Sequence, residues 1–305
     1  MNNKISMRDS FFDEIYNLAK EDKDIIVVSA DMGAPALDKF RKDFGGQFIN
    51  IGIAEHNLIA IATGLAAEGK KVFTYAIAPF ITSRCHEFIK VDVSLMNIPI
   101  NLVGVGTGFG YDDSGPTHHT TEDISIMRAL PNLEILSPSD SVMAGAFAKL
   151  AYESKSPVYI RLERQIMPVN YKESDSFERG FEELRRGDET VIISTGNMVH
   201  RALEVYEHFK GNQKIGVIDL YRLKPLNTDL KDTLSSYKRI ISLEEHLLDG
   251  GLGSIISEIV TDNNLSVRLK RIGLKGYFYE YGRDSIHKKT GLDKDSVREE
   301  TEKLI

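Results

Sequence analysis

The feature that most constrains the fold is an alternation of short β-rich runs with longer helix-like runs along almost the whole chain. In the first half, strands are expected at 24–30, 47–53, 71–76, 98–104, 133–136 and 158–162, and helices at 8–20, 55–67, 81–96, 122–130 and 141–153. The apolar residues of the 55–67 run recur at helical spacing. Because strands that alternate with helices are joined by right-handed crossovers, the pattern predicts a mainly parallel sheet flanked by helices.

A charged stretch at 167–188 interrupts this alternation and lacks a clean apolar period, so we expect a linker there. The alternation then resumes, with strands expected at 190–194, 214–219, 239–243 and 266–272, and helices at 198–210, 228–236, 252–261 and 295–303. A length of 305 residues agrees with two domains. The expected organisation is an α/β protein with one domain at 1–166 and a second, similar but smaller domain at 189–305.

Composition excludes several classes of protein. The formal charge is −7 and the pI is near 5.7, which argues against a surface that coats nucleic acid or binds an anionic membrane. Cys85 is the single cysteine, which excludes a disulfide framework and a multi-cysteine metal site. The start of the chain is polar and no apolar run approaches ~18 residues, so neither a signal peptide nor a membrane span is expected. These features together predict a cytoplasmic protein.

The first candidate site is the segment Asn-Ile-Gly-Ile-Ala-Glu-His-Asn at 50–57, where an expected strand leads into an expected helix. Glu55 opens that helix, and an acid in a first helical turn is favoured by the helix dipole alone. The same residue would also lie at the carboxyl edge of a parallel sheet, where α/β proteins bind their ligands. A carboxylate desolvated there could exchange a proton with a ligand.

A second candidate is the loop at 110–123, which carries Ser114, a Gly-Pro pair and the adjacent histidines His118 and His119. Paired histidines on such a loop suit proton chemistry or hydrogen bonds to a polar substrate. The alternatives are a solvated surface and a metal pair. A metal pair is disfavoured because the two histidines lack the helical spacing of a zinc motif.

Other patterns carry less weight. The glycines of 104–110 lack the phase of a dinucleotide-binding loop, and 248–253 lacks the Lys-Ser/Thr of a phosphate loop, so a tightly packed turn is expected at the latter. Glu244 and Glu245 are adjacent, and neighbouring side chains at a strand end point apart, which disfavours a catalytic pair. Four arginines lie near the ends of expected elements, where one or two could clamp an anion: Arg8, Arg84, Arg161 and Arg164.

Together, these segments resemble the second half of a transketolase. The resemblance runs in family order over essentially all 305 residues. It rests on GIAEHN at 52–57, a helix start with Phe80 and Arg84, GPTHHTTEDISIMRALPN at 115–132, SPSD at 137–140, SPVYIRLER at 156–164, STGNMVHRALE at 194–204, VIDLYRLKPLN at 217–227 and LEEHLLDGGLGS at 243–254. GIAE alone is shared with β subunits of 2-oxo acid dehydrogenases. The resemblance implies a pyrimidine-binding domain followed by a transketolase C-terminal domain.

Membership of that family implies thiamine diphosphate chemistry, in which the cofactor is the electron sink and the protein positions it. Glu55 matches the glutamate that hydrogen-bonds the aminopyrimidine ring and promotes formation of the ylide that attacks a ketose. Phe80 matches the aromatic residue that stacks on this ring. Asp31 matches an aspartate near the cofactor, and Ile53 belongs to the apolar approach to Glu55.

The resemblance also implies a set of residues for the sugar. His118 matches a catalytic loop histidine that contacts substrate hydroxyls, and Arg164 and Arg8 match arginines that hold a sugar phosphate. Ser114 stands where transketolases usually carry an aspartate that reads a donor hydroxyl. A histidine expected just after the strand at 98–104 is replaced by glycine or threonine at 106–107. The identity of the sugar, and whether it is phosphorylated, therefore stay open.

One part of the family site has no match. The family holds the diphosphate and Mg²⁺ through a Gly-Asp-Gly motif followed some thirty residues later by Asn-Asn. The run Asp249-Gly250-Gly251 with Asn263-Asn264 is too closely spaced and falls in the second domain. The resemblance therefore implies a split enzyme, in which a separate N-terminal-type subunit holds the diphosphate and Mg²⁺ (or Ca²⁺) within an α2β2 heterotetramer.

Three alternatives stay open. A 2-oxo acid dehydrogenase β subunit would need a lipoyl-domain partner, and the GPTHH block disfavours it. An enzyme similar to deoxyxylulose-phosphate synthase would share most of the same motifs. A non-catalytic subunit would keep the fold without the chemistry, which the joint presence of Glu55, Phe80 and His118 disfavours. The second domain carries no strong catalytic pattern and is expected to serve assembly.

Overall fold

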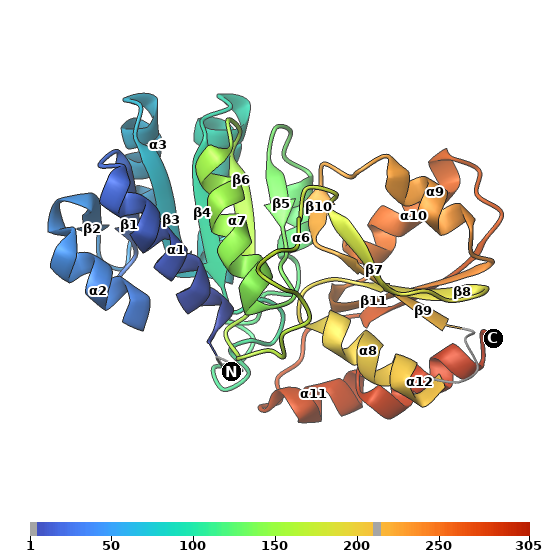
Figure 1. Cartoon of the computed structure of the whole chain (residues 1–305). Coiled ribbons are helices and arrows are strands. Elements are labelled where there is room, and N and C mark those ends of the chain that lie inside the picture. Colours follow the sequence, from blue (N-terminus) through green and yellow to red (C-terminus); the bar gives the residue numbers. More distant parts are fainter. Residues whose placement is uncertain (1–4, 210–214) are drawn as a thin grey trace.

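The computed structural model describes residues 5–209 and 215–305, which form two sheets side by side (Figure 1). The first is a seven-stranded sheet in the order β10-β5-β6-β4-β3-β1-β2. Its strands are β1 (Ile25–Ser29), β2 (Phe48–Asn50), β3 (Lys71–Ile77), β4 (Ile100–Val105), β5 (Glu134–Leu136), β6 (Val158–Leu162) and β10 (Arg222–Lys224). All neighbours pair in parallel except β10, which is antiparallel to β5.

Helices cover both faces of this sheet, each with its own apolar core. On one face lie α1 (Met7–Glu21), α2 (Pro35–Asp43) and α7 (Ser141–Glu153). On the other lie α3 (Glu55–Ala67), α6 (Asp123–Arg128) and the π-helical segment η2 (Ile89–Leu95). The short segments η1 (Gly45–Gln47), α4 (Ala78–Ile81) and α5 (His86–Phe88) complete this half.

The second sheet has five strands in the order β12-β11-β8-β9-β7. They are β7 (Phe181–Arg185), β8 (Thr190–Ser194), β9 (Ile215–Leu220), β11 (Arg239–Leu247) and β12 (Arg268–Leu274), parallel except for β7 against β9. Below the sheet in Figure 1 lie α8 (Met198–Phe209), α11 (Arg283–Thr290) and α12 (Lys294–Glu302), and above it lie α9 (Asp229–Ser235) and α10 (Leu252–Asp262).

The predicted α/β class, with two mainly parallel sheets flanked by helices, is confirmed. Local rules explain several boundaries. The Asp140 carboxylate accepts a hydrogen bond from the Met143 amide at 2.9 Å and caps α7, as an aspartate directly before a helix can. The apolar residues that recur at helical spacing in α3 are not all equally buried: Leu58 and Ala62 are buried, whereas Ile61 and Leu65 are half-buried.

Other predicted elements differ from the structure. The helix expected at 81–96 is broken into α4, α5 and η2, and the Thr82 hydroxyl donates to the Ala78 carbonyl at 2.6 Å where α4 ends. The expected linker at 167–188 contains β7, which pairs along the edge of the second sheet. Residues 210 and 214, at the ends of an expected helix and strand, lie outside the described residues. The domain limits themselves stay predictions.

The two halves are not independent bodies joined by a tether. Strand β10 comes from the second half of the chain but extends the first sheet beside β5. One apolar core, which contains residues of α3 and η2, continues into α9 and α10. Within the described residues, no helix is both long and apolar enough to span a bilayer.

Candidate functional site

The carboxyl edge of the first sheet presents Glu55. Strand β2 ends at Asn50, and Gly52, with a φ of 73°, turns the chain so that Glu55 becomes the first residue of α3. The Glu55 side chain is only 4% exposed, and Arg84 Nη1 donates to its Oε2 at 2.7 Å. No hydrogen-bond donor among the described residues reaches the other oxygen, Oε1. One carboxylate oxygen is therefore held in place and the other is free for a ligand.

Phe80 lies beside this carboxylate, on the short helix that follows β3. The Arg84 guanidinium lies 4.0 Å from the centre of the Phe80 ring. The Phe80 ring also meets the His118 ring edge-on, with 5.0 Å between centres. The arrangement places a carboxylate, an aromatic face and an imidazole side by side at one sheet edge.

The loop that follows β4 carries the polar part of the site. Tyr111 lies near His118, with 6.1 Å between ring centres, and the Arg164 guanidinium lies 4.4 Å from the centre of the Tyr111 ring. Arg164 Nη1 also donates to Asp113 Oδ1 at 3.1 Å, and the Ser114 hydroxyl donates to the same oxygen at 2.9 Å. Glu55 and Ser114 are thereby joined by an unbroken series of side-chain contacts.

Five of the residues predicted for the site belong to this series of contacts, namely Glu55, Phe80, His118, Ser114 and Arg164. Asp31, Ile53 and Arg8 do not. The members come from four connections at the same edge of the sheet, after β2, β3, β4 and β6. Parallel strands present their carboxyl ends at one edge, which explains how residues so distant in sequence meet.

Asp31 lies at the neighbouring end of β1, where it forms a reciprocal pair with Asn50. Its amide donates to Asn50 Oδ1 at 3.1 Å, and Asn50 Nδ2 donates to Asp31 Oδ1 at 3.0 Å. Asp31 has a φ of 56°, a strained conformation for a residue with a Cβ, and the pair holds it there. The Ile53 side chain is 78% exposed, so in this chain it does not bury Glu55.

Arg8 is ion-paired with Asp9, its neighbour in the first turn of α1, at 3.1 Å. Arg8 still acts on the site through its charge. Burial raises the pKa of Tyr111, and the positive charges of Arg164 and Arg8 both oppose that rise. Arg161, considered above as an anion clamp, is buried and committed to Asp123, to which its Nε donates at 2.6 Å.

The remaining sequence candidates have structural explanations. Glu244 and Glu245 do point apart: Glu244 accepts the amides of Leu252 and Gly253 at the start of α10, whereas Glu245 faces the first domain. A Cβ at Gly251 would lie 2.1 Å from Glu244 Oε2, so the turn at 248–253 is tightly packed, as predicted.

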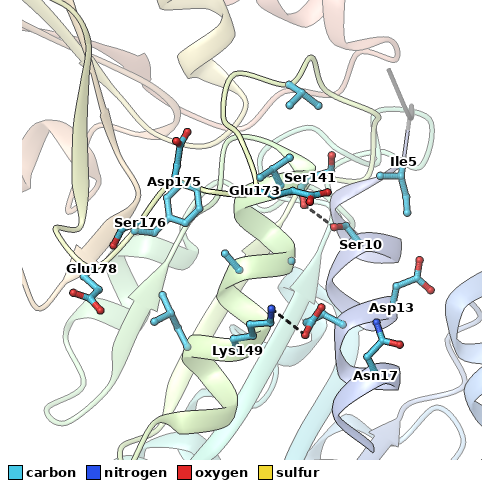
Figure 2. Close-up of a pocket in the computed structure, with 17 residues that line it drawn as sticks. Ile5, Ser10, Asp13, Asn17, Ser141, Lys149, Glu173, Asp175, Ser176 and Glu178 are labelled. Carbon is cyan, nitrogen blue, oxygen red and sulfur yellow. Dashed lines mark hydrogen bonds and ion pairs between the residues drawn. The ribbon is translucent and has the colours of Figure 1, made fainter. Parts of the chain in front are cut away.

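A separate cavity of about 840 Å³ lies between α1, α7 and the segment at 173–178 (Figure 2). Acidic side chains such as Asp13, Glu14 and Glu173 line much of it, and Lys149 lies 3.5 Å from Glu14. None of the residues predicted for the site lines this cavity. The convergence of side chains at the sheet edge, rather than this cavity, marks the candidate site.

Comparison with known families agrees with this geometry. A family model described as the transketolase pyrimidine binding domain matches residues 3–170, and one described as the transketolase C-terminal domain matches 180–297. The chain belongs to the transketolase family. The resemblance stated from the motifs is therefore confirmed.

Relatives within the transketolase family match the chain over nearly its whole length. It is 35% identical to an apulose-4-phosphate transketolase subunit of Phocaeicola vulgatus, over 97% of this chain and 96% of the relative. It is 33% identical to a 6-deoxy-6-sulfo-D-fructose transketolase subunit of a Clostridium species, over 96% and 92%. A solved split-gene transketolase, described as an inactive β4 tetramer, superposes with a TM-score of 0.88 at 28% identity, over 98% of both chains.

The residues present fit one end of a transketolase cofactor. A carboxylate oxygen free at Glu55, with an aromatic ring beside it at Phe80, suits a heteroaromatic ring that carries nitrogen atoms. For the diphosphate end, the described part of the chain offers no group of three or more His, Cys, Asp or Glu side chains that could hold a metal ion.

Two residues of this candidate site were not predicted from the sequence. Arg84 was considered as an anion clamp and belongs to one motif of the resemblance, but its pairing with Glu55 was not predicted. Tyr111 was not singled out, although it lies between Arg164 and His118. The spacing of four residues between Phe80 and Arg84 and the aromatic residue within the loop at 110–123 are the patterns that could have indicated them.

Proposed function

We propose that this chain is the smaller subunit of a thiamine-diphosphate-dependent transketolase that transfers a two-carbon ketol unit from a ketose to an aldose. Glu55, Phe80 and His118 would carry the cofactor-binding and catalytic contacts. The observation that supports the proposal most directly is their convergence at one sheet edge, in a chain whose relatives include named transketolase subunits.

Glu55 and Phe80 would receive the pyrimidine ring. Glu55 Oε1 is free to hold a proton toward a ring nitrogen, and Phe80 offers its face for stacking. Arg84 lies against both groups and has to turn aside for the ring to enter. When bound, thiamine diphosphate supplies the electron sink for cleavage of a carbon–carbon bond next to a carbonyl.

The loop after β4 and the segment after β6 would bind the sugar. His118 lies next to Phe80 and could donate or accept hydrogen bonds with substrate hydroxyls, and Ser114 lies further along the same loop. Arg164, whose side chain is 39% exposed, would hold a phosphate or another anionic group of the sugar in place of Asp113, with Arg8 contributing charge nearby.

The diphosphate and Mg²⁺ would be held by a separate N-terminal-type subunit, within a heterotetramer. The described residues offer no group of three or more His, Cys, Asp or Glu side chains that could hold a metal ion, and the two relatives described above are named as subunits. Large apolar side chains on and just after η2, at Val91, Leu95 and Met96, are 45%, 76% and 58% exposed. An exposed apolar group of this kind suits a protein partner.

Ketol transfer is favoured over the alternatives. The two relatives described above carry transketolase names and match over more than nine-tenths of their own length. A 1-deoxy-D-xylulose-5-phosphate synthase of Clostridium perfringens also matches, at the lower identity of 29%, over 95% of this chain but only 48% of the relative. The names of the two transketolase relatives specify a phosphorylated and a sulfonated sugar, so a ketose with an anionic end is the expected donor. In a non-catalytic subunit, nothing would require Phe80 to contact His118 directly and Glu55 through Arg84.

The test is calorimetric titration of thiamine diphosphate with Mg²⁺ into this chain alone, and into the chain co-expressed with a transketolase N-terminal-type subunit from the same genome. Binding only by the combined chains, followed by ketol transfer in a screen of ketose phosphates and sulfonates, is the expected result. Tight binding by this chain alone would show that it holds the diphosphate itself. Binding by neither preparation, with a pull-down showing that the two chains do associate, would overturn the proposal.

A further inference from the structure

In the glycine-rich run that follows β4, other residues pack directly against the glycine backbone. A Cβ at Gly108 would lie 1.9 Å from Glu245 Oε2, and a Cβ at Gly106 would lie 2.2 Å from the Tyr111 ring. A Cβ at Gly110 would meet the backbone of Gly106 at 2.7 Å and Glu163 Oε1 at 3.1 Å. Side chains at these positions are excluded by neighbours, so the glycines serve packing rather than a nucleotide.

Glu245, at the end of β11, enters the space that Gly108 leaves. Its Oε2 accepts the Phe109 amide at 2.9 Å. The same carboxylate receives two hydrogen bonds from Arg283, from Nε at 2.8 Å and Nη2 at 2.6 Å, and shares a fourth with His287 Nε2. A side chain of the C-terminal half is thereby hydrogen-bonded to the backbone of the loop that carries His118.

Arg283, the first residue of α11, connects this carboxylate to two further parts of the site. Its backbone amide donates to Asp112 Oδ2 at 2.7 Å, in the loop beside Ser114. Its Nη2 also donates to Glu163 Oε2 at 2.7 Å. The other oxygen of Glu163 accepts the amides of Arg164, at 2.7 Å, and Gln165, at 3.0 Å. One arginine is therefore bound to both segments that are expected to hold the sugar.

The network formed by Glu163, Glu245 and Arg283 is buried, so substitution of any one of its charged side chains affects the others. Glu163, Glu245 and Arg283 are all less than 10% exposed. Burial alone would raise the pKa of Glu245, but the Arg283 charge and the His287 hydrogen bond outweigh it and hold that pKa well below its usual range. Removing one partner of such a buried set leaves an uncompensated charge and disturbs the groups bound to it.

We infer that Arg283, together with Glu245, is a positioning residue for substrate binding: it fixes the loop at 106–120 and the Arg164 backbone from the C-terminal half of the chain. The ligand of that loop, a ketose with an anionic end, rests on the function proposed above. The second half of the chain then has a direct part in substrate binding, in addition to the assembly role expected from the sequence.

The network is separate from the residues expected to bind the cofactor. Glu55 and Phe80 are set by the connections after β2 and β3, and no hydrogen bond or ion pair within the described residues joins them to Glu163, Glu245 or Arg283. Loss of Arg283 should therefore weaken sugar binding and leave cofactor binding intact. A residue needed only for stability would lower the amount of active complex and leave its KM unchanged.

The experiment compares wild type, Arg283→Gln and Arg283→Lys in the complex with the partner subunit. Arg128→Gln is the control, because Arg128 also forms an ion pair between the halves, with Glu258 on α10, but lies outside the network. Three quantities are measured: KM and kcat with D-fructose 6-phosphate and D-xylulose 5-phosphate, the Kd for thiamine diphosphate with Mg²⁺, and hydrogen–deuterium exchange of residues 106–120.

For Arg283→Gln we expect KM to rise about tenfold or more, because displaced sugar contacts lose binding, with faster exchange in the loop and an unchanged cofactor Kd. Arg283→Lys should lie between wild type and Arg283→Gln, since an ammonium cannot form the forked pair with Glu245 and reach Glu163. Arg128→Gln should match wild type. If Arg283→Gln does not fold, Arg283→Lys alone decides the comparison.

An unchanged KM, an unchanged exchange rate in the loop, or a parallel loss of cofactor affinity would each overturn the positioning role. Failure of the proposed function is distinguishable, because it would show as absence of ketol transfer by the wild-type complex. The exchange measurement needs no activity and would still decide whether Arg283 holds the loop.

Discussion

At the scale of single residues, the candidate site at the sheet edge depends on a few polar side chains. Their hydrogen-bond partners determine which of their atoms are available to a ligand. Glu55 has one oxygen bound to Arg84 and one free, so the carboxylate is oriented before any ligand arrives. Arg164 is stacked on Tyr111 and paired with Asp113, so an incoming anion replaces an existing partner of the guanidinium. Binding therefore requires Arg84 to leave the site of the ring and Arg164 to exchange Asp113 for the ligand, and the new contacts must offset the loss of these existing ones.

Glu55→Gln tests the residue-scale assignment. A glutamine has nearly the same shape but cannot hold and release a proton, so kcat for ketol transfer by the reconstituted complex should fall about 100-fold or more. Initial rates with saturating cofactor would measure it. The matched control is Glu68→Gln, at the other end of α3, where the side chain is exposed. Equal rates for wild type and Glu55→Gln would remove Glu55 from the catalytic machinery.

At the scale of elements, helices and strands were predicted from the periodicity of apolar residues. These predictions were correct where apolar residues fill the buried positions of an element. The boundaries of α3, α7, β6 and β8 match the expected runs. Helix α11 was missed because its buried face contains Arg283 and His287 beside Ile286, and apolar periodicity does not detect a buried polar face. Strand β7 was missed for a related reason, since Phe181 is its only fully buried residue.

The loop after β4 provides a prediction about an element. Gly108→Ala should lower the thermal unfolding midpoint of the chain, because the φ of 57° costs an alanine about 1–2 kcal/mol and the new Cβ would displace Glu245. Gly64→Ala, in the middle of α3 with no heavy atom within 4 Å of an added Cβ, is the control and should raise the midpoint slightly. Differential scanning calorimetry of both variants measures the contrast. Equal midpoints for the two would show that Glu245 does not need the space at Gly108.

At the scale of the whole molecule, the two halves meet through buried polar groups as well as apolar ones. Asp219, at β9 in the second sheet, accepts hydrogen bonds from Ser139 at 2.5 Å and from Tyr171 at 3.0 Å. Burial raises the pKa of Asp219 to about 7, and the carboxylates of Asp140 and Glu182 add to the rise, while the two hydrogen bonds oppose it. This junction is therefore expected to respond to pH.

The sign of that response follows from proton linkage. Between about pH 4, the unfolded pKa, and about pH 7, the folded chain keeps a proton on Asp219 that the unfolded chain has lost. The stability contributed by this group is therefore complete below about pH 4 and is lost as the pH rises through about 7. Relative to Asp219→Asn, which cannot titrate, wild type should lose roughly 2–3 kcal/mol between pH 5 and pH 8.

Urea unfolding of wild type and Asp219→Asn at the two pH values measures this loss. Other titrating groups are common to both chains, so their contributions cancel in the comparison. Parallel changes in the two unfolding midpoints would show that Asp219 ionises alike in the folded and unfolded chains.

The sequence by itself determined the α/β class, most element positions and, through the resemblance, the residues that converge around Glu55. These properties follow from local patterns: apolar periodicity, helix caps and short motifs of fixed spacing act within a few residues. Tertiary structure alone decided the pairing of Arg84 with Glu55, the place of β10 in the first sheet, and the contacts of Glu245 and Arg283 with the loop after β4. Those contacts join residues as much as 176 positions apart, and only packing of the two halves determines which buried charges meet.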